Sequence, residues 1–238
     1  MPVLEQHAPG AGCVDVELKP RLIAVRRPRR PRGAVLVLHG GGARQGSTAV
    51  SPTQLSVLRM VPVARRVARD RGLAVYRLLN SRRGWDDTHT PVEDVRWALA
   101  EIREHLGPDA PVVLVGHSLG ARAAILAGDQ PGVVGVVALA AYLLPGDGDV
   151  VLTGRRVMFV HGARDRIASM SKARAEARRL ARSAPVGFVE VADGTHGMVR
   201  HHRAFDGAAA EFASALLSGR PARGAVGRVL AGEDLVEA

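Results

Sequence analysis

The chain has 238 residues, of which 47% are apolar and one (Cys13) is a cysteine, so it fits a single α/β domain without an internal disulfide. No apolar run reaches the roughly 18 residues of a membrane helix, and no basic-then-apolar leader opens the chain, so we expect a cytoplasmic protein without a membrane partner. Its formal net charge of +10 comes from scattered arginines rather than one continuous basic face, which argues against a nucleic-acid partner.

Short β-rich apolar runs alternate with helical patterns along the chain, which is typical of parallel βαβ units. The pattern predicts strands over residues 14–18, 22–26, 34–39, 73–79, 111–115, 133–140, 157–160 and 186–191. It predicts helices over residues 53–70, 91–106, 169–183 and 201–217, and another directly after Ser118. The expected fold class is therefore α/β, with a mostly parallel sheet of about eight strands flanked by helices.

The periodicity of apolar residues is weaker at the two ends of the chain than in its middle. Periodicity fades beyond about Ser218, so residues 219–238 are expected to be a loose tail or a short appended helix. Residues 1–12 are also expected to be loose. No internal repeat or linker divides the chain, and we therefore predict a single domain over residues 1–238.

A Gly-His-Ser-Leu-Gly run occupies residues 116–120, directly between a predicted strand and a helix rich in small residues. This is the Gly-x-Ser-x-Gly pattern of a nucleophile elbow, a strained turn that exposes the serine hydroxyl. Small residues on either side let strand and helix pass closely, and the helix N-terminus favours negative charge nearby. The pattern predicts Ser118 as a nucleophile, although a purely structural glycine-rich turn would share this sequence.

A nucleophilic serine needs a base, and the base needs a carboxylate that orients it. The loop after the strand at 157–160 carries Asp165, and the loop after the strand at 186–191 carries His196. Both are expected at the sheet edge that holds Ser118, in the chain order Ser, Asp, His. Asp165 alone would also suit a helix cap. Other side chains compete for these roles: Asp147, Asp149 and Asp193 as the acid, and His161, His201 and His202 as the base.

Acyl transfer also needs two backbone N–H groups aimed at the developing oxyanion. One is expected at Leu119, directly after the nucleophile, and the other at Gly41, with Gly42 close behind, in the glycine run after the strand at 34–39. Glycine lets the backbone approach a substrate without a Cβ in the way. No Gly-Lys-Ser/Thr follows this run and the histidines lack zinc-ligand spacing, so we expect neither a cofactor nor a metal.

With these motifs the sequence resembles the α/β-hydrolase superfamily over residues 14–217. The matching motifs are His-Gly-Gly-Gly at 39–42, Gly-His-Ser-Leu-Gly at 116–120, His-Gly-Ala-Arg-Asp at 161–165 and Asp-Gly-Thr-His-Gly at 193–197. The first is similar to that of hormone-sensitive-lipase-like esterases, but the Gly-Asp-Ser-Ala-Gly elbow and N-terminal cap of that group are missing. The compact chain resembles small carboxylesterases and dienelactone-hydrolase-like members, although dienelactone hydrolases proper have a cysteine where this chain has Ser118.

The resemblance also implies an open site. Lids in this superfamily are inserted after the strand that here ends near Ala140, yet the next strand begins by about Val157 and leaves only a short loop. We therefore expect a lidless enzyme rather than an interfacially activated lipase. Tyr142 and Leu143 in this loop, together with Trp85, are expected to line the substrate pocket, although core positions would suit the first two equally well.

The sequence thus predicts a serine hydrolase, a carboxylesterase, that cleaves an ester or related acyl compound through an acyl-enzyme on Ser118. A thioesterase or an acyltransferase would use the same residues and is the alternative among enzymes. A peptidase is disfavoured, because the propeller or cap domains common among such peptidases are missing. The alternative outside the enzymes is a catalytically silent binding protein, a type that usually lacks one of the three residues.

Overall fold

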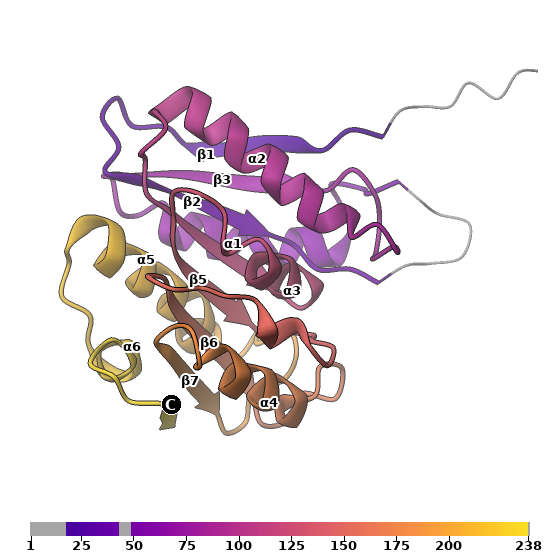
Figure 1. Cartoon of the computed structure of the whole chain (residues 1–238), viewed down its shortest axis with the longest axis vertical. Helices are drawn as coiled ribbons and strands as arrows, with labels where there is room; N and C mark the ends of the chain where they lie inside the picture. Colours follow the sequence, from indigo (N-terminus) through magenta and orange to yellow (C-terminus); the bar gives the residue numbers. More distant parts are fainter. Residues whose placement is uncertain (1–17, 43–48, 238) are drawn as a thin grey trace, which may run out of the picture.

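The computed structural model describes residues 18–42 and 49–237. Within them eight strands form one sheet: β1 (Arg21–Arg26), β2 (Gly33–Leu38), β3 (Leu73–Leu79), β4 (Val112–His117), β5 (Val133–Leu139), β6 (Arg156–Gly162), β7 (Val186–Val191) and β8 (Leu235–Glu237). β1 runs antiparallel to β3, and the other neighbouring pairs are parallel (Figure 1). This confirms the expected mostly parallel sheet. Residues 14–17 of the expected first strand lie outside the described residues.

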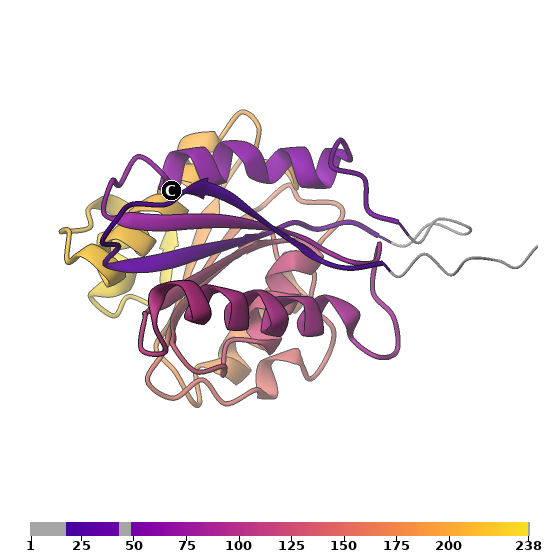
Figure 2. The same ribbon diagram turned by 90° about the horizontal axis from the view of Figure 1, so that it is seen from above.

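Six helices flank the sheet in the described part of the chain: α1 (Leu55–Val67), α2 (Thr90–Leu106), α3 (Leu119–Leu126), α4 (Met170–Leu180), α5 (Ala208–Ser218) and α6 (Gly224–Leu230). Figure 2 shows the two longest on opposite faces, with the purple α1 above the sheet and the magenta α2 below it. Because helices cover both faces, the central strands are buried throughout and read as continuous apolar runs.

Each face of the sheet has its own apolar core. Side chains alternate between faces along a strand, so on β2 Leu36 belongs to the cluster with α2, α3 and α4. Val35 and Val37 belong to the other cluster, with α1, α5 and α6. The result is a three-layer arrangement in which the sheet is a rigid platform for the loops at its ends.

The strands lie in the order β1-β3-β2-β4-β5-β6-β7-β8, and the side of the sheet on which the chain adds its next strands changes between β2 and β4. From β2 the chain passes to β3 on one side, and from β4 it continues through β5, β6 and β7 on the other. Ligands of open α/β sheets bind outside the carboxyl ends of strands at such a switch point. Here β2 leads into His39 and the glycine run, and β4 leads into Ser118. The topology therefore brings two of the predicted motifs side by side.

Some boundaries differ from those expected. The helix expected over residues 201–217 begins as a π-helical turn, η2 (Arg203–Gly207), before α5. Residues 219–237 form α6, which agrees with the short appended helix expected as the alternative to a loose tail, and then β8, which pairs with β7 at the sheet edge and buries Val236 fully. A strand of three residues is too short for the alternation of apolar and polar residues to be recognised in a sequence. The strand is evident only from its pairing with β7 in the folded protein.

Because Val236 is fully buried in the core with α1, α5 and α6, Val236→Ala should lower the free energy of unfolding by about 2 kcal/mol. Leu235→Ala, next to it but 45% exposed, is the control and should change it much less. Chemical denaturation of both variants measures the difference. Equally small effects would show that the C-terminal strand does not pack in solution.

Candidate active site

Ser118 lies on a strained turn between β4 and α3. Its backbone angles are φ 57° and ψ −120°, a conformation that residues with a side chain rarely adopt. Its N–H donates to the Leu139 carbonyl of β5 over 2.9 Å, and its carbonyl accepts the Ala121 N–H over 3.0 Å. The strand-turn-helix geometry expected of a nucleophile elbow is therefore held from both sides by the backbone.

Two glycines make this turn possible. A Cβ on Gly116 would lie 2.2 Å from the carbonyl oxygen of Gly120, and a Cβ on Gly120 would lie 2.5 Å from that of His39. No side-chain movement could relieve either contact, because both partners are backbone atoms. The ends of β2 and β4 and the start of α3 thus meet around Ser118 without space for a side chain at either glycine.

Asp165 and His196, from the loops after β6 and β7, form a hydrogen-bonded pair. The Nδ1–H of His196 donates to Oδ2 of Asp165 over 2.8 Å, which leaves Nε2 as the proton acceptor of the neutral ring. The other carboxylate oxygen accepts the N–H groups of Ile167 (2.8 Å) and Ala168 (2.9 Å). The Asp165 side chain is fully buried, so these contacts define a single orientation.

Burial and hydrogen bonding act in opposite directions on the pKa of Asp165. Burial disfavours the charged form and would raise the pKa, but the hydrogen bonds from His196 and from two backbone N–H groups outweigh it and hold the pKa below its usual value. The group is therefore a carboxylate at neutral pH. An ionised acid is what fixes the tautomer of an imidazole and stabilises its protonated form.

The loops that carry Asp165 and His196 touch through their backbones. A Cβ on Gly162 would lie 2.2 Å from the carbonyl oxygen of Gly194, and the N–H of Arg164 donates to that oxygen over 2.9 Å. This approach brings the acid within hydrogen-bonding distance of the imidazole. Gly162 and Gly194, which belong to two separate sequence motifs, therefore form one backbone contact.

The competing side chains have other partners or lie elsewhere. The three carboxylates each pair with an arginine: Asp193 with Arg164 (2.7 Å), Asp147 with Arg122 (2.8 Å) and Asp149 with Arg182 (2.9 Å). His161 is fully buried and donates its Nε2–H to the Ala168 carbonyl over 3.0 Å, so it supports the loop after β6 that carries Asp165, which we call the acid loop. His201 and His202 lie at the start of the next helical segment, and His202 is exposed.

The glycine run after β2 lies against the elbow. A Cβ on Gly40 would be 2.9 Å from Cβ of Ser118 and 3.6 Å from the nitrogen of Leu119. Gly41 has φ +133°, and a Cβ there would lie 2.6 Å from the side-chain nitrogen of Gln54. Within the described residues the N–H groups of Gly41 and Leu119 donate to no other group. They are the two N–H groups that the sequence predicts for an oxyanion.

His39 orients the peptide between Gly40 and Gly41. Its Nδ1–H donates to the Gly40 carbonyl (2.7 Å), and its Nε2 accepts the N–H of Asn80 (3.2 Å). Burial lowers the pKa of His39, so the ring is neutral, as one donor and one acceptor require. In a trans peptide the carbonyl and the N–H point in opposite directions. The Gly41 N–H therefore points away from His39.

Two further residues support the loop after β7 that carries His196, which we call the histidine loop, and the sequence analysis did not identify either of them. His117, inside the elbow, donates its Nε2–H to the His196 carbonyl over 3.0 Å, and burial lowers its pKa to about 3. Arg59 of α1 donates to the Gly197 carbonyl (2.5 Å) and to Asp206 (2.9 Å). A histidine beside the nucleophile is a visible signal in the sequence. Arg59 is one arginine among many, and nothing nearby in the chain distinguishes it.

Ser118 and His196 open into one cleft of about 550 Å³. Gly40, Gly41 and Gly42 line one side of it. The other lining residues come from the start of α1, the end of β4 and the loops after β6 and β7. The connection between β5 and β6 has a single 3₁₀ turn, η1 (Asp147–Asp149), as its helical structure, and none of its residues lines the cleft.

The three side chains expected in the substrate pocket are not among the residues that line this cleft. Leu143 is buried in the core with α2, α3 and α4. Trp85 stacks on the guanidinium of Arg122 at 4.0 Å, and Tyr142 is exposed outside the cleft. The loop after β5 begins beside Ser118, where the Tyr142 N–H donates to the Ser118 carbonyl over 3.3 Å, and then folds back so that η1 packs on α4.

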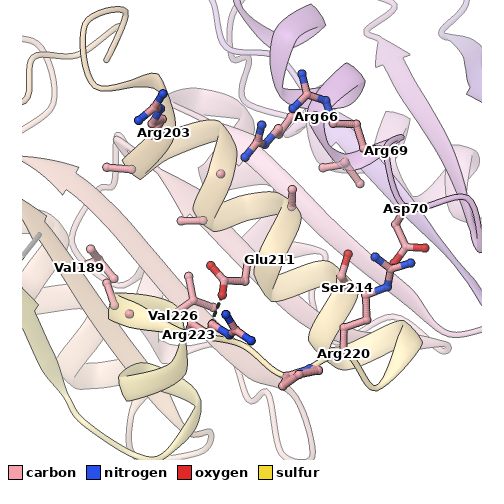
Figure 3. A pocket seen from close by; sticks show the side chains of 18 residues that line it. Arg66, Arg69, Asp70, Val189, Arg203, Glu211, Ser214, Arg220, Arg223 and Val226 are labelled. Atoms are coloured by element: carbon pink, nitrogen blue, oxygen red, sulfur yellow. Dashed lines mark hydrogen bonds and ion pairs between the residues drawn. The ribbon is translucent and has the colours of Figure 1, made fainter.

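A larger hollow of about 680 Å³ lies between α1, α5 and α6 (Figure 3). It shares no lining residue with the Ser118 cleft, and its described lining includes no histidine. Charged side chains dominate it: Asp70 pairs with Arg220 (3.3 Å), and Glu211 accepts the backbone N–H of Arg223 (2.5 Å). The larger hollow is therefore not the one that contains Ser118 and the hydrogen-bonded pair of Asp165 and His196.

The described part of the chain holds no group of three or more side chains suited to bind a metal ion. None of its helices is long and apolar enough to cross a membrane. Cys13 lies outside the described residues.

Comparison with known proteins agrees with this fold. The sequence matches the alpha/beta hydrolase family over residues 35–236, so the chain belongs to the α/β-hydrolase family. No curated protein matches it. Est1E from Butyrivibrio proteoclasticus, with ferulic acid bound, is similar in structure, with a TM-score of 0.62 and 14% identity over 84% of this chain and 96% of that one.

Two other solved structures share the fold. A serine hydrolase without a lid from Xanthomonas campestris has a TM-score of 0.59 and 19% identity over 80% of this chain and 85% of that one. The thermophilic esterase Est2 from Thermogutta terrifontis, with propionate bound, has a TM-score of 0.62 and 17% identity over 84% and 88%. Family membership and these neighbours support hydrolase activity.

Gly162→Ala should push the loops of Asp165 and His196 apart, because the added Cβ would lie 2.2 Å from a backbone oxygen. A displacement of about 1 Å at a catalytic pair costs on the order of 100-fold, and we expect that loss in the rate of labelling by a fluorophosphonate, which reacts with activated serines. Gly207→Ala, where an added Cβ meets nothing within 4 Å, is the control. Equal rates in both variants would show that the loop contact is not needed.

The buried His117 should make the protein less stable in mild acid. An unfolded histidine has a pKa of about 6.5, whereas burial keeps folded His117 neutral down to about 3, so between these values the unfolded state binds more protons. The free energy of unfolding therefore falls as pH falls through this window. For His117 alone the loss between about pH 7.5 and pH 5 is about 2 kcal/mol.

Urea denaturation at the two pH values measures this effect. His117→Gln cannot titrate in this range, so its acid-induced loss should be smaller than that of the wild type by about 2 kcal/mol. His202→Gln, which removes an exposed histidine, is the matched control and should retain the wild-type loss. The assignment fails if His117→Gln loses as much stability as the wild type.

Proposed function

We propose that the protein is a serine hydrolase that cleaves an ester through an acyl-enzyme formed on Ser118. His196 serves as the base and then the acid, and Asp165 orients it. One observation carries the proposal: a serine on a strained elbow shares a cleft with a histidine whose Nδ1–H is held by a buried carboxylate. A serine, a histidine and a carboxylate that orients it are the three groups that nucleophilic catalysis by serine uses.

The first half of the reaction transfers the acyl group to the enzyme. Oγ of Ser118 attacks the carbonyl carbon of the ester while Nε2 of His196 takes the hydroxyl proton. The carbonyl oxygen becomes an oxyanion, which we assign to the N–H groups of Leu119 and Gly41, with Gly42 as the neighbouring donor. When the tetrahedral intermediate collapses, the bond to the alcohol oxygen breaks, and that oxygen takes the proton from His196.

The second half releases the acid. Water gives a proton to Nε2 of His196 and attacks the acyl carbon, which forms a second oxyanion at the same two N–H groups. Collapse of this intermediate breaks the bond to Oγ of Ser118, which takes the proton back. Asp165 remains ionised throughout and stabilises the imidazolium, in agreement with the lowered pKa of its carboxyl group.

The open cleft favours hydrolysis over acyl transfer, because solvent water can reach the acyl-enzyme. A thioester would pass through the same steps, with a thiol as the leaving group. The cytoplasmic location and the lack of nucleic-acid or membrane partners stay predictions from the sequence. Arg59 and His39 act indirectly in this scheme, since each contacts a loop and neither contacts Ser118.

A fluorophosphonate probe should label the wild-type protein, because the probe forms a covalent bond with an activated serine. Labelling should vanish in Ser118→Ala and fall strongly in His196→Ala, whereas Ser171→Ala, an exposed serine on α4, should label as the wild type does. Mass spectrometry of the labelled peptide locates the adduct. Undiminished labelling of Ser118→Ala would remove the proposed nucleophile.

A further inference from the structure

Exposed apolar side chains border the cleft at Ser118. We call them the apolar collar: Leu55, Leu58, Ile167 and Val199, with exposed fractions of 83%, 44%, 65% and 74%. They are four of the eight large apolar side chains that are exposed among the described residues. Single exposed apolar residues are ordinary, but their concentration around one opening marks a binding surface.

The segments that carry the collar are those that carry the reacting groups. Ile167 lies two residues after Asp165, and Val199 lies three residues after His196. Leu55 and Leu58 lie at the start of α1, on either side of Ser56 and Val57 in the chain. A Cβ on Gly41 would be 3.1 Å from Oγ of Ser56, so this end of α1 adjoins the glycine run. The collar therefore borders both the glycine side and the histidine side of the cleft.

No unpaired charge lines the cleft in the described residues. Its one charged side chain is Arg59, which donates to the Gly197 carbonyl and to the Asp206 carboxylate and is only 12% exposed. The other side chains of the lining are apolar, hydroxyl or imidazole groups. A carboxylate or phosphate on the substrate would lose hydration on entering without gaining an ion pair, which is costly.

Positive charge gathers instead at the separate hollow between α1, α5 and α6 (Figure 3). Five arginines and two carboxylates line that hollow: Arg66, Arg69, Arg203, Arg220 and Arg223, with Asp70 and Glu211. Anionic groups are therefore attracted to a different part of the surface. The two hollows differ in chemical character, and the one that contains Ser118 suits uncharged, apolar groups.

We propose that the cleft and the apolar collar bind the acyl chain of a neutral aliphatic ester whose chain is long enough to reach the collar. The inference rests on the proposed serine-hydrolase function and specifies its substrate class. An acetyl group fits beside Ser118 and leaves the collar exposed to water, whereas a longer chain covers it. Each methylene group that leaves water favours binding about fourfold, and contacts kept in the transition state raise kcat/KM.

A series of p-nitrophenyl esters from acetate to octanoate tests the proposal, because the leaving group stays constant. kcat/KM should rise by about fourfold per methylene group over the first part of the series, and on the order of 100-fold from acetate to hexanoate. The p-nitrophenyl ester of succinate, whose acyl group ends in a carboxylate, should be hydrolysed more slowly than the butyrate ester. A flat or falling series, or a preference for the succinate ester, would overturn the proposal.

Two valines provide a matched pair of variants. Val199→Asn removes an apolar contact of the collar and should lower the hexanoate-to-acetate ratio of kcat/KM on the order of fivefold. Val151→Asn changes a valine that is 65% exposed in the loop after β5, outside the cleft, and should leave the ratio unchanged. An unaltered ratio in Val199→Asn would count against the collar.

Fluorophosphonate labelling separates the two levels of the proposal. If Ser118 is labelled but kcat/KM does not rise with chain length, the substrate class is wrong and the hydrolase function stands. If Ser118 is not labelled, both fail together. Circular dichroism of each variant ensures that a change in the ratio reflects binding rather than unfolding.

Discussion

Direct contact between backbones at the end of β4 is the constraint on which the site depends. With no Cβ at Gly116 or Gly120, the ends of β2 and β4 and the start of α3 meet closely enough to force Ser118 into φ 57°. The same device recurs where Gly162 meets Gly194 and brings the acid loop to the histidine loop. Close packing of this kind leaves the reacting groups little freedom, which is how a fold preorganises a catalytic geometry.

Three buried histidines complete this arrangement, and each supports a different loop. His39 donates to the carbonyl of Gly40 in the glycine run, His117 to that of His196, and His161 to that of Ala168 in the acid loop. Burial lowers the pKa of all three, so each is a neutral ring with a defined donor nitrogen. A neutral imidazole satisfies a buried carbonyl without placing a charge beside His196, the proposed base, where that charge would disfavour protonation of the ring.

The distribution of charge agrees with an apolar substrate. The chain has a formal net charge of +10, yet Arg59 is the one arginine among the described residues that lines the Ser118 cleft, and its guanidinium is held by the Gly197 carbonyl and the Asp206 carboxylate. Arg59 connects α1, which carries Leu55 and Leu58, to the histidine loop. One side chain therefore joins the helix that carries part of the collar to the loop that carries His196, the proposed base.

The sequence by itself determined the succession of strands and helices from β1 to α5, the elbow at Ser118 and the loops of Asp165 and His196, because these depend on apolar periodicity and turn chemistry within a few residues. Only the tertiary structure decided that Tyr142, Leu143 and Trp85 lie outside the cleft, that β8 completes the sheet, and that Arg59 contacts Gly197. The physical reason is distance along the chain. Arg59 and Gly197 are 138 residues apart, and no local pattern records a contact that forms only when α1 and the loop after β7 meet at one edge of the sheet.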